Sequence, residues 1–188
     1  MGAALKLTTW ISPEEYLEGE RLAEVRHEYV DGRVYAMAGA KANHNRISVN
    51  ITSRLHTALS GKPCEPFTTD MKTRIRWLEK TIFYYPDVLV CCDPTDDAEE
   101  FRDRPQIIFE VLSDSTARLD RWEKRLAYQS IPTLVMYVLV EQKMRRLTVY
   151  RRETNWTLET VEPPAEALEI ASLGITLTLE SIYERTGL

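Results

Sequence analysis

The sequence predicts a single α/β or α+β domain in which a mixed central β-sheet is flanked by helices. Three features indicate this class: helical patterns precede a run of strands, short apolar stretches of strand length recur, and one helical pattern interrupts them. With 188 residues and 44% hydrophobic content, the chain is long enough for one full core and short for two. We therefore expect one domain over residues 1–188, with a core from about residue 10 to residue 185.

Two helices separated by a hairpin are predicted in the first third of the chain. Ser12, followed by Pro13 and two glutamates, is a typical helix start. The apolar stripe of this helix is expected to be Tyr16, Leu17 and Leu22. In residues 27–39, HEYVDGRVYAMAG, the Asp-Gly pair at 31–32 indicates a tight turn between two strands. Apolar residues at helical spacing predict a second helix from near Asn43 to about residue 60.

The rest of the chain is predicted to be mainly strands with one helical crossover. Residues 67–77 alternate in polarity, which places four charged residues on one strand face: Asp70, Lys72, Arg74 and Arg76. Two apolar strands follow, separated by an acidic loop at residues 93–105. The remaining elements are expected to be a helix over about 116–130, a buried strand over 134–140, a hairpin of 145–152 with 155–161, and a short helix over about 179–185.

Composition limits the environment of the protein. No apolar run approaches the roughly 20 residues that span a bilayer, and the first ten residues, MGAALKLTTW, lack the pattern of a signal peptide. The three cysteines have no metal-ligand spacing, and we expect them to be reduced core residues: Cys64, Cys91 and Cys92. These observations predict a cytoplasmic protein without a membrane partner.

The net charge of −5, from 24 basic and 29 acidic residues, disfavours non-specific binding to a nucleic-acid backbone. It leaves a nuclease possible, because bound cations would offset part of the charge of a carboxylate site.

Two acidic residues stand inside apolar strands. Asp87 lies in YYPDVLVCC and Glu110 lies in IIFEVL, where an ionised carboxylate is unfavourable unless it is paired, hydrogen-bonded or bound to a metal. Two such acids on separate buried strands suggest a shared site for a hard cation such as Mg²⁺, which prefers oxygen ligands and can activate water for phosphoester hydrolysis. Alternatively, each acid meets an arginine or a backbone turn at a strand end. Pro86 favours an edge or bulge at this point.

An ordered set of motifs carries a family resemblance. The set consists of HEYVDGRVYAMAG, His44 on a helix, YPDV, FEVLSDST, D-x-x-x-K-x-x-x-Y and ASLGITLTLESIYE. In order and spacing, from about Trp10 to Glu184, the chain resembles a family of restriction endonucleases in the PD-(D/E)XK nuclease superfamily. The resemblance implies a restriction-endonuclease-like core. It also implies an endonuclease that uses Mg²⁺ or Mn²⁺, and no organic cofactor, to cleave DNA phosphodiester bonds.

The resemblance also implies roles for individual residues. Pro86-Asp87 corresponds to the "PD" and Glu110 to the (D/E) of the superfamily pattern. The pattern then expects lysine two residues later, where this chain has Leu112. The resemblance places the lysine on the following helix, at Lys124, where it would orient or activate the attacking water.

Further residues complete the predicted site. Glu28 matches an additional acid that serves as a metal ligand beside Asp87 and Glu110, and Asp70 is another candidate acid. His44 either caps a helix, makes a structural hydrogen bond or contacts a substrate phosphate. The cationic strand residues, Lys72 and Arg74 among them, either contact the DNA backbone or form a solvated sheet face.

The helix that carries Lys124 has two opposite stripes at about 100° per residue. The apolar stripe is Leu119, Trp122 and Leu126, and the polar stripe is Asp120, Lys124 and Tyr128. Periodicity alone favours burial of the apolar stripe, with Asp120 and Lys124 as an exposed i,i+4 pair. The resemblance favours the opposite orientation, which would leave Trp122 for a subunit interface. A homodimer is expected on this interpretation, since two one-site copies would cut both strands of a duplex.

The sequence therefore favours a Mg²⁺-dependent endodeoxyribonuclease and leaves two alternatives open. One is an inactive nuclease-fold module for binding or assembly, which Leu112 in place of the expected lysine keeps open. The other is a metal-dependent phosphoesterase that acts on RNA or small nucleotides. No motif for sequence-specific readout is recognisable. An active nuclease requires Asp87 and Glu110 close together with Lys124 nearby, whereas an inert module could have both acids neutralised by arginines.

Overall fold

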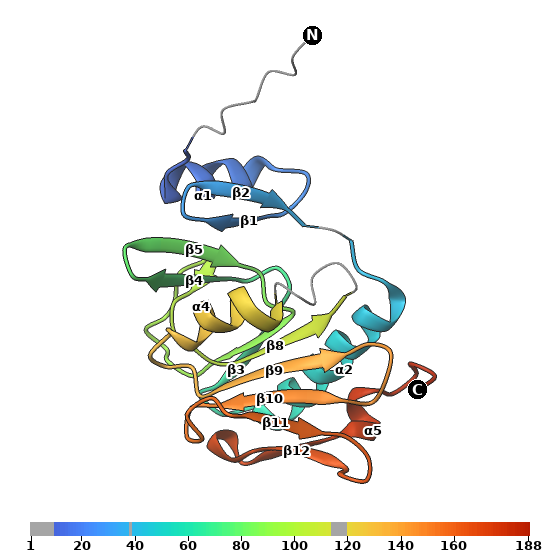
Figure 1. Ribbon diagram of the computed structural model, residues 1–188. Coiled ribbons are helices and arrows are strands. Elements are labelled where there is room, and N and C mark those ends of the chain that lie inside the picture. The colour runs from blue at the N-terminus through green and yellow to red at the C-terminus, as the bar shows by residue number, and fades with distance from the viewer. Residues whose placement is uncertain (1–9, 38, 114–119) are drawn as a thin grey trace.

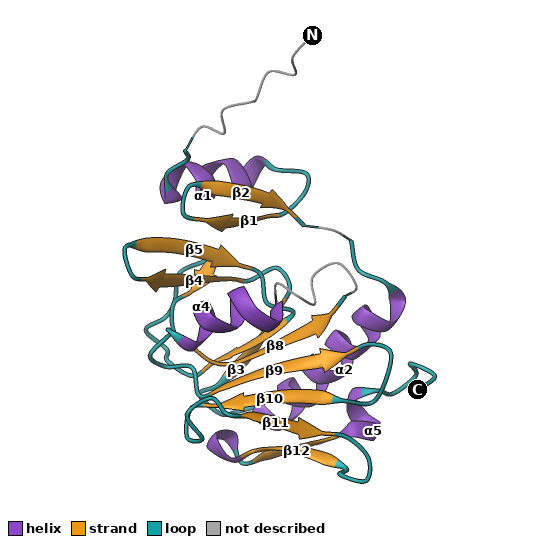
Figure 2. Ribbon diagram, in the orientation of Figure 1, coloured by secondary structure: helices purple, strands orange, loops and turns teal. Residues whose placement is uncertain are grey.

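Two β-sheets enclose a short helix, and a longer helix covers the outer face of the second sheet (Figure 1). The computed structural model describes residues 10–37, 39–113 and 120–188. The helices and most of the strands follow one another in the order that the sequence predicts (Figure 2). The fold is thus of the mixed α/β (α+β) class, with the difference that the strands form two main sheets where one central sheet was expected.

The first sheet has the strand order β2-β1-β5-β4-β7, in which β4 and β7 are parallel and the other neighbours are antiparallel. Its strands are β1 (His27–Val30), β2 (Arg33–Ala36), β4 (Lys72–Trp77), β5 (Lys80–Tyr84) and β7 (Phe101–Arg102). Helix α1 (Pro13–Leu22) packs on one face through Tyr16, whose ring stacks on Tyr29 with centroids 5.0 Å apart. The predicted hairpin turn forms at Asp31-Gly32, where both residues have positive φ, 47° and 88°.

The second sheet has the strand order β11-β10-β9-β8-β6-β3, in which β8 and β9 are parallel and the other neighbours are antiparallel. Its strands are β3 (Glu65–Thr68), β6 (Val88–Cys91), β8 (Pro105–Leu112), β9 (Met136–Glu141), β10 (Leu147–Arg151) and β11 (Leu158–Val161). Helix α2 (Ala42–Leu59) buries Ile47, Ile51 and Leu55 against one face. The same core continues into the C-terminal elements β12 (Ala167–Ile170), η2 (Ala171–Leu173), β13 (Ile175–Thr178) and α5 (Leu179–Ile182).

The crossover between β8 and β9 is a π-helical turn, η1 (Asp120–Lys124), followed by α4 (Arg125–Gln129). This segment lies between the two sheets, where Tyr128 contacts Tyr84 of the first sheet and Tyr137 of the second. Lys124 and Tyr128 are buried, whereas Trp122 and Leu126 are 62% and 46% exposed. The orientation that periodicity alone favours is therefore wrong. Leu119 lies outside the described residues, as does the side chain of Asp120.

Three local expectations also differ from the structure. Residues 67–77 do not form one strand, because a turn separates β3 from β4 and Asp70 lies in that turn. The run 84–92 is likewise divided, since β5 ends at Tyr84 and β6 begins after Pro86-Asp87. Leu22, expected in the apolar stripe of the first helix, is 86% exposed. Within the described ranges, no helix is long and apolar enough to cross a membrane.

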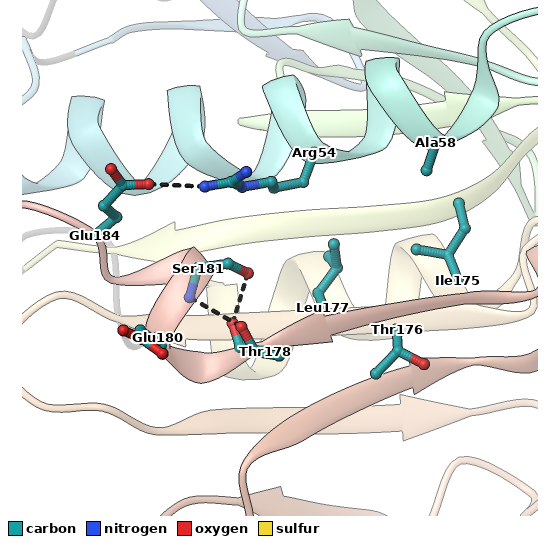
Figure 3. A pocket seen from close by; sticks show the side chains of 9 residues that line it. All are labelled: Arg54, Ala58, Ile175, Thr176, Leu177, Thr178, Glu180, Ser181 and Glu184. Carbon is teal, nitrogen blue, oxygen red and sulfur yellow. Dashed lines mark hydrogen bonds and ion pairs between the residues drawn. The ribbon is translucent and has the colours of Figure 1, made fainter.

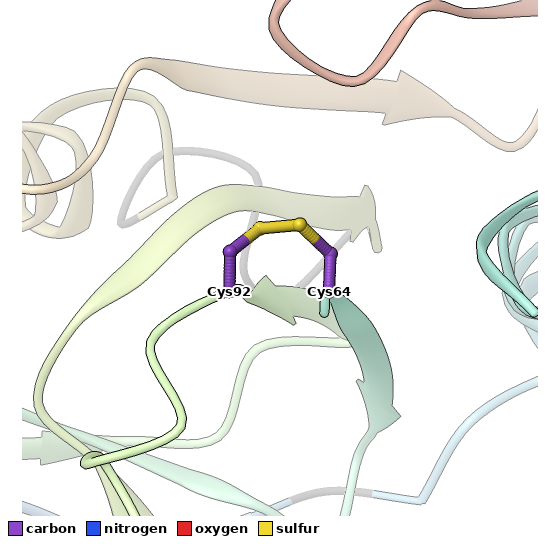
Figure 4. Close-up of a disulfide and its surroundings, with 2 residues drawn as sticks. All are labelled: Cys64 and Cys92. Carbon is purple, nitrogen blue, oxygen red and sulfur yellow. A yellow bond between two sulfur atoms is a disulfide. The ribbon is translucent and has the colours of Figure 1, made fainter. Parts of the chain in front are cut away.

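Cys64 and Cys92 form a disulfide, which corrects the expectation of three reduced cysteines (Figure 4). The register of β3 and β6 pairs Glu65 with Cys91, so the next residues outward, Cys64 and Cys92, face each other across the strands. A separation of 28 residues in sequence gave no sign of this pairing. Cys91 is a buried free thiol with its Sγ 3.6 Å from Asp96, and burial raises the pKa of Cys91.

Candidate active site

The antiparallel pairing of β6 and β8 brings Asp87 and Glu110 together. Val88 pairs with Phe109, so extension of the register by one residue places Asp87 opposite Glu110. Residues directly opposite in such a pair have Cβ atoms roughly 4.5–5.5 Å apart. Both side chains are buried, with residue exposures of 6% and 4%. The two acids that the sequence singled out on separate strands thus lie in one place.

Two hydrogen bonds hold the Asp87 carboxylate. Its Oδ2 accepts the backbone N–H of Val111 at 2.7 Å, and its Oδ1 lies 2.7 Å from Nε2 of His44. An ionised carboxylate can only accept hydrogen bonds, so Nε2 of His44 is the donor. Because His44 lies in the first turn of α2, this contact links the helix to the sheet edge. Of the alternatives for His44, the structure shows a hydrogen bond to a site acid.

Lys124 lies between acids from the two sheets. Its Nζ is 2.7 Å from Oε1 of Glu28 on β1 and 3.4 Å from Oε1 of Glu110 on β8. The ammonium group also lies over the ring of Tyr84, 5.2 Å from the centroid. The three charged side chains are 6%, 11% and 5% exposed for Lys124, Glu28 and Glu110. The predicted lysine therefore reaches the predicted acids, although it comes from the helix.

Tyr128 adds a donor for which the sequence analysis assigned no role. One helical turn after Lys124, its hydroxyl donates to Oε1 of Glu110 at 2.9 Å. Burial, followed by the nearby charge of Glu110, raises the pKa of Tyr128 well above its usual value. The hydroxyl therefore stays protonated and remains a donor. Its spacing of four residues from Lys124 was the available signal, whereas nothing in the sequence indicated the role of the Val111 N–H.

The donor set is made of oxygen atoms and carries negative charge. Among the described side chains, the acids Glu28 and Glu110 contact the Lys124 ammonium and the acid Asp87 contacts His44. In the part of the chain that the structure describes, no three acidic, histidine or cysteine side chains converge closely enough to hold a metal by themselves. Two carboxylates are, however, what Mg²⁺ commonly takes from a protein, with water and phosphate oxygens as its other ligands. Asp87 and Glu110 fit that requirement.

Comparison with known proteins places this chain in a family. The model of the Uma2 family, described as "Putative restriction endonuclease", matches residues 13–180. The chain belongs to the Uma2 family. Two proteins of Synechocystis sp. (strain PCC 6803) are similar to it: "Uncharacterized protein slr1290" is 35% identical over 92% of this chain and 91% of its own length. "Uncharacterized protein sll1609" is 33% identical over 80% of this chain and 87% of its own length.

A solved structure shares the fold. It is described as "a putative nuclease belonging to DUF820 from Anabaena variabilis", and it superimposes with a TM-score of 0.73. The match covers 94% of this Uma2 chain and 99% of that chain at 16% sequence identity. At this identity the likeness shows a common nuclease-like fold.

Two of the predicted substrate-binding residues of this Uma2 chain lie away from the acidic cluster, which consists of Glu28, Asp87 and Glu110 around Lys124. Asp70, proposed from the sequence as an acid beside the site, is exposed in the turn before β4 and pairs with Arg26. Lys72 is buried under the ring of Tyr85, with Nζ 5.2 Å from the centroid, and burial lowers the pKa of Lys72. Tyr85 in turn donates to Glu20 of α1, so Lys72 lies on the α1 side of the first sheet.

Arg74 is also bound elsewhere. Its guanidinium makes two hydrogen bonds with the Asp103 carboxylate, at 2.7 and 2.5 Å, and lies over the ring of Phe101. It lines a groove of about 340 Å³ together with Arg76 and Arg104. Because Asp103 occupies the Nε–Nη2 edge of the guanidinium group, Arg74 has a structural partner at the position where the sequence suggested a phosphate contact.

A larger groove of about 560 Å³ lies between α2 and the C-terminal segment β13–α5 (Figure 3). Its polar groups pair with one another: Arg54 with Glu184 at 2.8 Å, and Ser181 with Thr178 through both its N–H and its hydroxyl. None of the residues of the acidic cluster lines it. The groove and the candidate site are separate features of this Uma2 domain.

Proposed function

We propose that this chain is a metal-dependent endodeoxyribonuclease that hydrolyses phosphodiester bonds in DNA. The observation that carries the proposal is the register of β6 and β8, which on extension by one residue sets buried Asp87 opposite buried Glu110, with the Lys124 ammonium beside Glu110. The family description, restriction endonuclease, supports a nucleic acid as the substrate. Asp87 and Glu110 would hold a Mg²⁺ or Mn²⁺ ion, with Glu28 close by.

The chain's own residues would organise the reaction around that ion. A divalent cation at the two carboxylates would polarise a phosphoryl oxygen and lower the pKa of a bound water. Lys124 would orient the attacking water and would stabilise the negative charge that develops on the phosphate. Glu28 holds the Lys124 ammonium at 2.7 Å, which keeps the positive charge beside the reacting atoms. Tyr128 holds the Glu110 carboxylate in the same orientation throughout.

The partners of the acids favour this function over an inactive module. Lys124 stands beside Glu110 although Leu112 occupies the usual position of the lysine. The described partners of the two acids are a lysine, a tyrosine, a histidine and a backbone amide, at distances from 2.7 to 3.4 Å. These described partners do not include the arginines that an inert module could have.

The test is a plasmid-cleavage assay with Mg²⁺ or Mn²⁺. Wild type is compared with Asp87→Asn and Glu110→Gln, and Glu180→Gln, an exposed acid on α5, serves as the matched control. We expect cleavage by wild type and by Glu180→Gln, and none by the two site variants or in excess chelator. Equal cleavage by all four proteins, or cleavage in chelator, would contradict the proposal. Cleavage of RNA or nucleotides alone would favour the phosphoesterase alternative.

We also propose that the active form is a homodimer, because two one-site copies can cut both strands of a duplex. Trp122, at 62% exposure on the outer side of η1, is the candidate contact. Sedimentation of wild type and Trp122→Ala tests this: we expect a dimer whose dissociation constant rises in the variant. A wild type that stays monomeric at all concentrations would contradict it.

A further inference from the structure

We propose that His44 is a positioning residue that fixes the Asp87 carboxylate for cation binding, through the hydrogen bond donated by its Nε2. The inference rests on the proposed function, in which Asp87 holds the divalent ion, and it adds a residue to which neither the family model nor the relatives assign a role. It differs from the phosphate contact that the sequence suggested for His44, since the partner of Nε2 is a protein carboxylate.

The geometry of Asp87 shows why a positioning residue is needed. Asp87 lies in the bend just before β6, outside the hydrogen-bonded ladder. Instead, both carboxylate oxygens are hydrogen-bonded: one accepts from the backbone N–H of Val111 on β8 and the other from Nε2 of His44 on α2, each at 2.7 Å. With both oxygens fixed from different elements, rotation about the side-chain bonds is prevented. Each carboxylate oxygen has about two lone pairs, so one on each oxygen remains available for a cation.

The packing of α2 shows that the helix has apolar anchors besides this contact. The helix is anchored by Ile47, Ile51 and Leu55, each 0% exposed in the core below the second sheet. His44 is at the end of the helix, and its side chain remains 14% exposed at the rim of the site. Loss of its ring should therefore leave the apolar anchors intact. The effect of a substitution should appear in cation affinity more than in stability.

Three substitutions of His44 separate a hydrogen bond at Nε2 from other roles. The amide nitrogen of glutamine lies at about the reach of Nε2, whereas that of asparagine lies near the position of Nδ1. We expect His44→Ala and His44→Asn to bind Mn²⁺ roughly 10–100-fold more weakly than wild type, as is typical when an outer partner of a metal ligand is lost. His44→Gln should recover most of the affinity. Calorimetric titration with Mn²⁺ in the absence of DNA measures this independently of cleavage.

The outcomes distinguish this inference from the proposed function. Asp87→Asn is titrated in parallel, and thermal unfolding checks that each protein is folded. If Asp87→Asn binds Mn²⁺ as wild type does, the metal site itself is refuted, and the positioning role with it. If Asp87→Asn loses binding but His44→Ala keeps it, only the role of His44 is overturned. Equal weakening in His44→Ala and His44→Gln would also overturn it, as would a raised KM for DNA with unchanged Mn²⁺ affinity.

Discussion

Substitution of Lys124 by methionine should destabilise the protein strongly, because it leaves two buried acids without their cation. The ammonium lies 2.7 Å from Glu28 and 3.4 Å from Glu110, and all three side chains are at most 11% exposed. At an effective dielectric constant of about 20, unit charges at these separations attract by roughly 5–6 kcal/mol per pair. Desolvation offsets part of this attraction, and removal of one partner of a buried ion pair typically costs about 3–5 kcal/mol. We expect a loss of that size in Lys124→Met.

Urea denaturation at pH 7 measures the loss, and Lys62→Met is the matched control. Lys62 is exposed in the turn after α2, so the same substitution there should change the free energy of unfolding by no more than about 0.5 kcal/mol. Mn²⁺ should restore more stability to Lys124→Met than to wild type, since a cation that binds the folded state compensates the two acids. If Lys124→Met were as stable as Lys62→Met, the ammonium would not be held between the acids, and the role proposed for Lys124 in the mechanism would be refuted.

Three other changes test neighbouring features. Tyr128→Phe removes the donor to Glu110 and should lower the free energy of unfolding by about 1–3 kcal/mol; an unchanged urea midpoint would contradict the hydrogen bond. Lys72→Met should stabilise the protein at pH 7 by about 1 kcal/mol, because it removes a buried charge. Burial lowers the pKa of Lys72 below its ordinary value of 10.5. Between the lowered pKa of the folded state and the ordinary pKa of the unfolded state, the unfolded lysine holds a proton that the folded one has released. Wild-type stability should therefore rise with pH in this range, and the variant should lack this slope. Alkylation of the unfolded, unreduced protein should modify one thiol, and reduction of Cys64–Cys92, which are 28 residues apart, should cost about 3–4 kcal/mol in unfolding free energy. Three reactive thiols would show that the disulfide is absent.

Local signals in the sequence were sufficient for most helices and turns. The helix start that the Ser-Pro-Glu-Glu pattern predicts forms at Ser12, where Ser12 and Glu15 make a capping box, and both residues of the predicted Asp31-Gly32 turn have positive φ. The division of the strands into two sheets was not predictable in this way, because it depends on which strands pair over long separations. The small β12–β13 hairpin was likewise not expected, although Gly174, with φ of 64°, provides its turn.

The candidate site was predictable where a residue conflicts with its surroundings. Asp87 and Glu110 are acids in apolar segments, and this conflict can be recognised from the sequence alone. Their partners are determined by register and helix position, so Val111 and His44 could not be assigned from the residues alone. For the same reason Lys72 was wrongly expected on an accessible cationic face. Alternation in polarity predicts which residues share a face of a strand, but it does not predict which face a helix covers.

The orientation of η1 indicates that pairing of buried charges outweighs burial of apolar area in this segment. Burial of Trp122 would have gained about 2–3 kcal/mol, yet it is exposed while the ammonium of Lys124 is inside. In the opposite orientation Glu28 and Glu110 would be buried without the ammonium, and the loss of one partner of a buried ion pair typically costs about 3–5 kcal/mol, which outweighs that gain. If the cluster is retained for chemistry, replacing all three charges together (Glu28→Leu, Lys124→Met, Glu110→Gln) should leave stability unchanged or raise it by about 1–4 kcal/mol, because desolvation of buried ions is avoided. Cleavage should then be lost in a protein that unfolds no more readily than wild type in urea. A triple variant less stable than Lys124→Met alone would instead show that the ions stabilise the fold, and their burial would need no catalytic explanation.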